Sequence, residues 1–125
     1  MTLSKKATRV LFWVTTVIIF LFEGVMVALT SHTELAREGV AHLGYPDYFR
    51  YLLGGFKVSG SLALIIPAVS ARIKEWAYAG FGFVFVSAFV SHAVVDGLSN
   101  GMTYFPLVFL GILAVSYRMF HKLSK

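Results

Sequence analysis

The chain has 125 residues, of which 58% are hydrophobic and only 14% are charged, and its mean hydropathy is +0.76. Soluble globular proteins are about one quarter charged, so this composition argues against a soluble enzyme and for a protein embedded in lipid. The absence of cysteine excludes disulfides, thiolate metal sites, iron–sulfur clusters and cysteine nucleophiles. The length fits one domain, residues 1–125, with room for about four membrane crossings of roughly 20 residues each.

Four apolar segments predict four transmembrane helices. The first, residues 10–29, is longer than the apolar core of a secretory signal and is interpreted as a retained helix. The other three are residues 52–69, 76–95 and 102–120, and residues 30–51 form the one long loop. Backbone groups within hydrocarbon must be hydrogen-bonded inside the protein. The expected fold is therefore all-α, an integral membrane four-helix bundle.

The long loop is expected to contain a short helix. Its segment HTELAREGVAHL places Leu35, Val40 and Leu43 where they can face the membrane interface. Gly44 is expected to end this helix, and Pro46 to turn the chain towards the second span. The simplest interpretation of the segment is a lid that lies on the lipid headgroups.

The basic residues predict how the bundle is oriented. Three precede the first span, two lie between the second and third, and three close the chain, so eight of the eleven share one side. Loops rich in lysine and arginine stay in the cytoplasm, so both termini are predicted to be cytoplasmic and the protein to lie in the inner membrane of the cell. Basic residues beside a membrane fit anionic lipid headgroups, and no nucleic-acid partner is expected.

Three ionisable residues interrupt the apolar segments: Glu23, Lys57 and His92. A charge at the bilayer centre costs about 2.5–3.5 kcal/mol on insertion scales. At 1.5 Å per residue from the outer span ends, Glu23 lies roughly 10 Å deep, Lys57 roughly 8 Å and His92 roughly 6 Å. Asp96 lies one helical turn from His92 on the same face. Because the depths nearly coincide, we expect one polar cluster, with Glu23 paired to Lys57 and with His92 and Asp96 alongside.

Two other interpretations of this cluster stay open. The Glu23–Lys57 pair can serve only to fix the register of the helices, or Lys57 can extend alone to the outer headgroups. Ser61, one turn from Lys57, is a candidate supporting residue because its hydroxyl can join the cluster.

No catalytic residue is assigned from the sequence, and whether the protein is an enzyme is left open. Ser91, His92 and Asp96 contain the residue types of a hydrolase triad. Ser91 and His92 are neighbours on a helix and point about 100° apart, however, so the triad is weakly supported. Ser91 is instead a candidate supporting residue. No ligand-spacing motif indicates a metal.

A protonatable pocket near the outer leaflet fits the head group of a quinone or another isoprenoid lipid. A quinone carbonyl needs a donor such as Lys57 or neutral His92, and its reduction needs a proton relay, which Glu23 and Asp96 can supply. The same groups suit a small proton-coupled transporter. Four spans make a narrow bundle without an inverted repeat, so a transporter would have to be a homo-oligomer, namely a dimer.

Several motifs resemble the DoxX-like family of small membrane proteins, and this resemblance implies a four-helix membrane bundle. The wider DoxX grouping is named for a membrane subunit linked to thiosulfate:quinone oxidoreductase, which implies a role beside a redox enzyme. Without cysteine, sulfur oxidation would need a partner protein. The matching motifs are Leu43-Gly44-Tyr45-Pro46, Lys57 with Gly60, Lys74-Glu75-Trp76-Ala77-Tyr78-Ala79-Gly80-Phe81, Ala88 and Ser91-His92.

The sequence thus predicts a multi-pass membrane protein with a buried polar site, acting as a quinone- or lipid-binding accessory subunit of a membrane redox system. The alternatives are a structural or assembly partner of a larger membrane enzyme and a small transporter. Expected contacts are the lipid bilayer, a redox partner protein and further copies of the chain.

Overall fold

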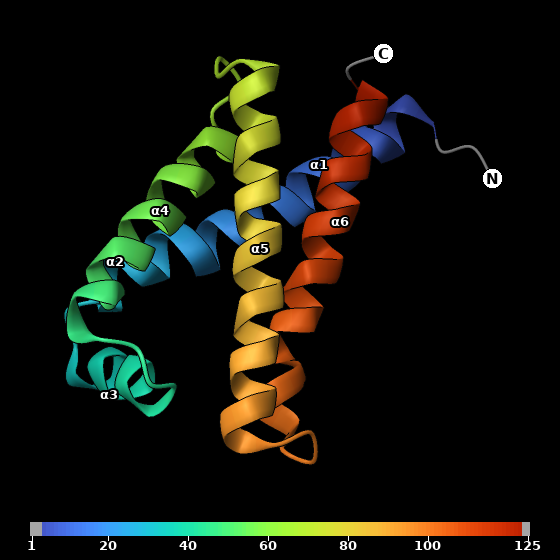
Figure 1. Cartoon of the computed structure of the whole chain (residues 1–125). Coiled ribbons are helices and arrows are strands. Elements are labelled where there is room, and N and C mark those ends of the chain that lie inside the picture. Colours follow the sequence, from blue (N-terminus) through green and yellow to red (C-terminus); the bar gives the residue numbers. More distant parts are fainter. Residues whose placement is uncertain (1–3, 124–125) are drawn as a thin grey trace.

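A computed structural model describes residues 4–123, which are almost entirely helical and contain no strand. The all-α prediction is therefore confirmed. Figure 1 shows the helices in chain order: α1 (Lys5–Ile19), the π-helical turn η1 (Phe20–Val25), α2 (Met26–Thr30), α3 (Glu34–His42), α4 (Asp47–Ile65), α5 (Ala71–Asp96), the 3-10 turn η2 (Gly101–Tyr104) and α6 (Phe105–Leu123).

Three helical segments of the described chain are long and apolar enough to cross a membrane. They are Lys5–Thr30, in which α1, η1 and α2 form one continuous rod, Ala71–Asp96, which is α5, and Gly101–Leu123, which joins η2 to α6. Their outer faces expose large apolar side chains, with Phe83 74% and Val94 79% accessible. Such surfaces are unfavourable in water and suit contact with lipid tails.

The second predicted span corresponds to α4, which differs from the other three. It begins at Asp47 rather than at residue 52, directly after Pro46, and it ends at Ile65, ahead of Pro67. Its first turns carry Asp47 and Arg50, and it is not among the helices that qualify as spans by length and composition. A fourth crossing, and with it the four-helix count, stays a prediction.

The helices pack as a slanted bundle around aromatic side chains. In Figure 1, α4 and α6 flank α5 on opposite sides, and α1 crosses behind them. α1 packs mainly on α6, whereas η1 packs on α4. One core cluster joins Ile19, Leu64, Tyr78, Phe81, Phe85, Phe109 and Leu113. The start of α1, the α4–α5 turn and the end of α6 lie at one end of the bundle, and α3 lies at the other.

The predicted short helix in the long loop is confirmed as α3. Thr33 caps its first turn by accepting a hydrogen bond from the backbone N–H of Ala36 at 3.3 Å. Gly44 follows the helix with a φ of +89°, a conformation that glycine adopts at little cost. The chain then turns through Pro46 into α4.

The turn between α4 and α5 is closed by Lys74, one of the two basic residues between the second and third predicted spans. Its Nζ donates to the carbonyls of Ala63, Leu64 and Ile66 at 2.7, 3.0 and 2.8 Å. The last carbonyls of a helix have no partner within that helix. Lys74 supplies these partners and is buried as a result.

The rod formed by α1, η1 and α2 meets α4 at a very close contact. A Cβ atom placed on Gly24, in η1, would lie 2.3 Å from the Oγ of Ser61 and 3.1 Å from its Cβ. Ser61 is completely buried, and its hydroxyl donates to the carbonyl of Val58 at 2.9 Å. The hydroxyl of Ser61 is therefore engaged in this helix contact.

Replacing Gly24 by alanine is expected to destabilise the protein by about 1–3 kcal/mol, the usual cost of forcing extra volume into a packed contact. Unfolding in detergent micelles measures the effect. Adding Ser61→Gly to the same chain should restore part of the loss. Gly111→Ala is the control, because a Cβ at Gly111 meets nothing within 4 Å. Equal stability of Gly24→Ala and Gly111→Ala would contradict the close contact.

Candidate functional site

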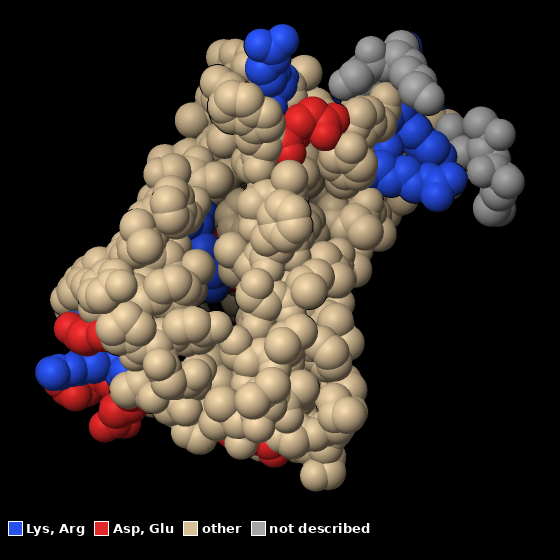
Figure 2. All heavy atoms as spheres, in the orientation of Figure 1, with Lys and Arg blue, Asp and Glu red and all other residues tan. Residues whose placement is uncertain are grey.

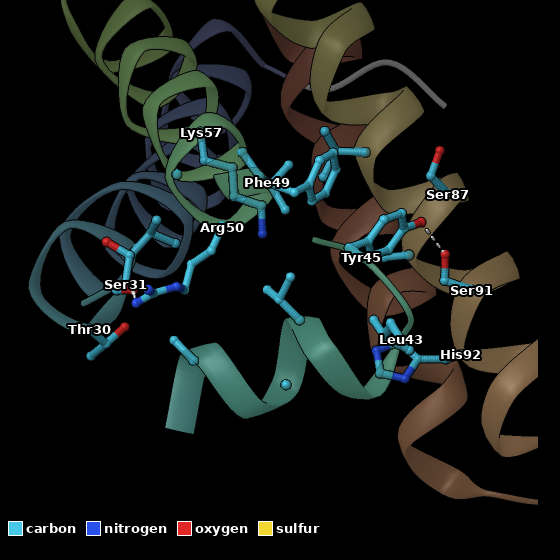
Figure 3. Close-up of a pocket in the computed structure, with 18 of the residues that line it drawn as sticks. Thr30, Ser31, Leu43, Tyr45, Phe49, Arg50, Lys57, Ser87, Ser91 and His92 are labelled. Carbon is cyan, nitrogen blue, oxygen red and sulfur yellow. Dashed lines mark hydrogen bonds between the residues drawn. The ribbon is translucent and has the colours of Figure 1, made fainter. Parts of the chain in front are cut away.

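A cavity of about 490 Å³ lies between α3 and the ends of α2, α4 and α5. Figure 3 shows α3 running along the lower side of this space. Most of its wall is apolar, and a few polar side chains reach it, among them Tyr45, Arg50, Lys57, Ser91 and His92. A space of this volume, with apolar walls and a few polar groups, is typical of sites for small organic ligands.

Lys57 is the charged group that projects into the middle of this cavity. It leaves α4, and its ammonium group points towards the open space in Figure 3. The Nζ of Lys57 lies 3.5 Å from the Oε1 of Glu23, and the two side chains are only 19% and 12% exposed. Glu23 comes from η1 behind the cavity wall and does not line the cavity. Glu23 thus pairs with Lys57 from outside the cavity, while the ammonium group of Lys57 faces the open space.

His92 lines the cavity on the side of α5, and Asp96 connects it to α3. The Nδ1 of His92 lies 3.0 Å from one carboxylate oxygen of Asp96, and the Nε2 of His42 lies 2.5 Å from the other. His92 and Asp96 are one turn apart on α5, whereas His42 ends α3. The carboxylate therefore ties the end of α3 to the end of α5.

The four candidate residues form two pairs instead of one connected cluster. Glu23 joins Lys57, and His92 joins Asp96. Among residues 4–123, no hydrogen bond or ion pair links one pair to the other, although Lys57 and His92 line the same cavity. The two pairs therefore meet at the cavity through Lys57 and His92, one from each pair.

Tyr45 forms a second connection between the α3–α4 segment and α5. Its hydroxyl and that of Ser91 share a hydrogen bond of 2.6 Å, drawn as a dashed line in Figure 3. The ring of Tyr45 stacks on Phe49 with centroids 4.5 Å apart. Ser91 therefore supports the wall of the cavity through Tyr45. Ser61 does not line the cavity.

Arg50 is a buried charge of the site that the sequence analysis assigned to the outer loop. Its Nη1 donates to the carbonyl of Ser31 at 2.6 Å and its Nη2 to Asp47 at 3.2 Å, while the guanidinium lies 4.4 Å from the ring centre of Tyr51. The available signal was the spacing of Asp47 and Arg50, which is typical of one helical turn. Arg50 links the end of α2 to the start of α4.

The arrangement can donate hydrogen bonds to a ligand and hold it within apolar walls. Lys57 carries three N–H donors, and Glu23 is its one hydrogen-bonding or charged partner within the described chain. No group of three or more histidine, cysteine or acidic side chains converges as a metal site within residues 4–123. The site thus offers donors and an apolar surface.

A protein-family model described as the DoxX-like family matches residues 11–116 of the chain. This range includes every candidate site residue described above. No curated protein and no solved structure matches the chain.

Proposed function

Because this chain belongs to the DoxX-like family and is a membrane protein with several long apolar helices, we propose that it binds the head group of a quinone or a related isoprenoid lipid. The site is the cavity between α3 and the ends of α2, α4 and α5. In this proposal the protein is an accessory subunit that presents the lipid to a membrane redox partner.

The observation that carries the proposal is the apolar cavity of about 490 Å³ with the ammonium group of Lys57 directed into it. A quinone is an apolar ring with carbonyl oxygens that accept hydrogen bonds. The wall offers the apolar surface, and Lys57 offers N–H groups that Glu23 does not use. His92 stands at another part of the wall as a second donor or acceptor, depending on its tautomer.

The course of the chain supports a fourth crossing by α4. α1 and α5 begin at the same end of the bundle (Figure 1), and the rod that starts with α1 ends at the other. The chain must therefore return between α2 and α5, and α4 makes this return. We propose four crossings with both termini in the cytoplasm, because most basic residues lie at the end where α1 begins.

A structural role is the second candidate, and the Glu23–Lys57 pair favours it. This pair joins η1 to α4 within the bundle and is mostly buried. An ion pair of this kind can fix the register of two helices without binding anything. The protein would then act as an assembly partner of a larger membrane enzyme, and the cavity would have no ligand.

Exchange of Lys57 for methionine separates these two candidates. We expect wild-type protein in lipid nanodiscs to bind a benzoquinone with a short isoprenoid tail, and Lys57→Met to bind it at least tenfold more weakly. A hydrogen bond from a charged donor contributes about 1.5–3 kcal/mol, and a tenfold change in affinity is about 1.4 kcal/mol. Equilibrium binding of the radiolabelled quinone measures the difference.

Lys6→Met is the matched control, because it removes the same charge from the exposed start of α1. Its affinity for the quinone should equal that of wild type. No binding by the wild-type protein, or equal binding by wild type and Lys57→Met, would contradict the proposed site and leave the structural role.

A further inference from the structure

A second hollow lies next to the cavity on the outside of the bundle. It has a volume of about 540 Å³ and lies between α4 and α5, nearer to the turn that joins them. Figure 2 shows the molecule hollowed between these two helices, with basic atoms visible inside. We refer to this hollow, bordered by Phe56, Gly60 and Ala63 of α4 and by Trp76, Ala77 and Gly80 of α5, as the furrow.

The furrow exists because small residues face it from both helices. Small side chains usually allow two membrane helices to approach closely and fill the space between them. Here the space beside α5 stays open, since a Cβ placed on Gly80 would meet no atom within 4 Å. Trp76, at the rim, is 70% exposed. The furrow is thus an apolar channel on a lipid-facing side of the protein.

The furrow and the cavity adjoin at Lys57. Lys57 and Val84 line both spaces. A molecule with its polar head beside Lys57 therefore has an apolar path leading away from the head along the furrow. A transmembrane helix from another protein fits this place poorly. Its backbone carbonyls are already hydrogen-bonded within that helix, so it would cover the N–H donors of Lys57 without accepting hydrogen bonds from them.

We propose that the furrow holds the long hydrocarbon tail of the lipid whose head group lies in the cavity, and that this lipid enters sideways from the bilayer between α4 and α5. This inference rests on the proposed function and adds the class of ligand to it: a long-tailed isoprenoid quinone. The tail contacts Gly60, Ala77 and Gly80 and passes the ring of Trp76.

The test compares two benzoquinones with the same head group, one with a single isoprene unit and one with a long polyisoprenoid tail. Gly80→Leu fills the furrow and should weaken binding of the long-tailed quinone at least tenfold while leaving the short-tailed quinone unaffected. Gly82→Leu is the matched control: Gly82 lies on the same helix, lines neither space, and a Cβ there also meets nothing within 4 Å. It should change neither affinity.

The outcomes separate this inference from the proposed function. If Gly80→Leu binds the long-tailed quinone as tightly as Gly82→Leu does, or loses both quinones equally, the tail does not occupy the furrow. If wild-type protein binds neither quinone, the proposed function fails as well.

A second measurement does not depend on a substitution in the furrow. In a Trp13→Phe chain, Trp76 is the only tryptophan. A long-tailed quinone with a nitroxide on its tail should quench the fluorescence of Trp76, and excess unlabelled quinone should reverse the quenching. Quenching that the unlabelled quinone does not reverse would overturn the proposal.

Discussion

Exchange of Glu23 for glutamine is expected to lower the free energy of unfolding by about 2–3 kcal/mol. The substitution leaves the ammonium group of Lys57 without its charged partner in a mostly buried place. Removing one member of a fully buried ion pair costs about 3–5 kcal/mol. The expected cost is smaller here because Lys57 also faces the cavity, where water can reach it. Denaturant titration in micelles measures the change.

The double variant Glu23→Gln with Lys57→Met tests whether the two charges act on each other. Removing both charges leaves no unpaired ion, so the double variant should be more stable than Glu23→Gln alone, and the two single effects should not add. Its quinone binding should stay as weak as that of Lys57→Met. Additive losses would show that the pair does not interact in the folded protein.

Exchange of Lys74 for methionine is expected to cost about 2–4 kcal/mol of stability. The methionine keeps most of the volume but removes three hydrogen bonds from Nζ to the carbonyls of Ala63, Leu64 and Ile66. Buried acceptors without a partner cost about 1–3 kcal/mol each. The expected total is below three times that value because the turn can move and admit water. Thermal unfolding in micelles measures the loss.

Arg72→Met is the control for Lys74→Met. Arg72 lies two residues earlier in the first turn of α5 and is exposed, so its replacement should change stability by less than about 0.5 kcal/mol. Similar losses in the two variants would mean that stability depends on the positive charge at this end of the bundle and not on the hydrogen bonds from Lys74 to the carbonyls at the end of α4.

The helices could be predicted because apolar runs in the sequence are long, but their ends could not. α5 was expected from residue 76 and begins at Ala71. Its first residues, ARIKE, include three charged side chains, so a search for apolar runs does not include them in the helix. Ser70 begins the helix by accepting a hydrogen bond from the N–H of Ile73 at 3.4 Å. α4 begins early for the same reason, since its first residues are charged.

The candidate site could be predicted where the geometry of one helix or a shared depth determined it. His92 and Asp96 lie one helical turn apart. The number of residues from the outer span ends placed Glu23 and Lys57 at nearly the same depth, and the Nζ of Lys57 lies 3.5 Å from the Oε1 of Glu23. The reach of His42 to Asp96 could not be predicted, because the two residues are 54 positions apart and meet only through the tertiary fold. The burial of Lys74 was missed because basic residues between spans are usually solvated.

The π-helical turn η1 makes the helix contacts of the first rod sensitive to the number of residues in that turn. A chain one residue shorter between Phe20 and Val25 could close as a regular α-helix, and everything on one side of the deletion would rotate by about 100° about the rod axis. Thr16 shares a hydrogen bond with Ser116 of α6 on one side, while Glu23 faces α4 on the other. Deletion of Phe20, Leu21 or Phe22, which lie between Thr16 and Glu23, would therefore break one of these contacts, whereas many point substitutions would preserve both.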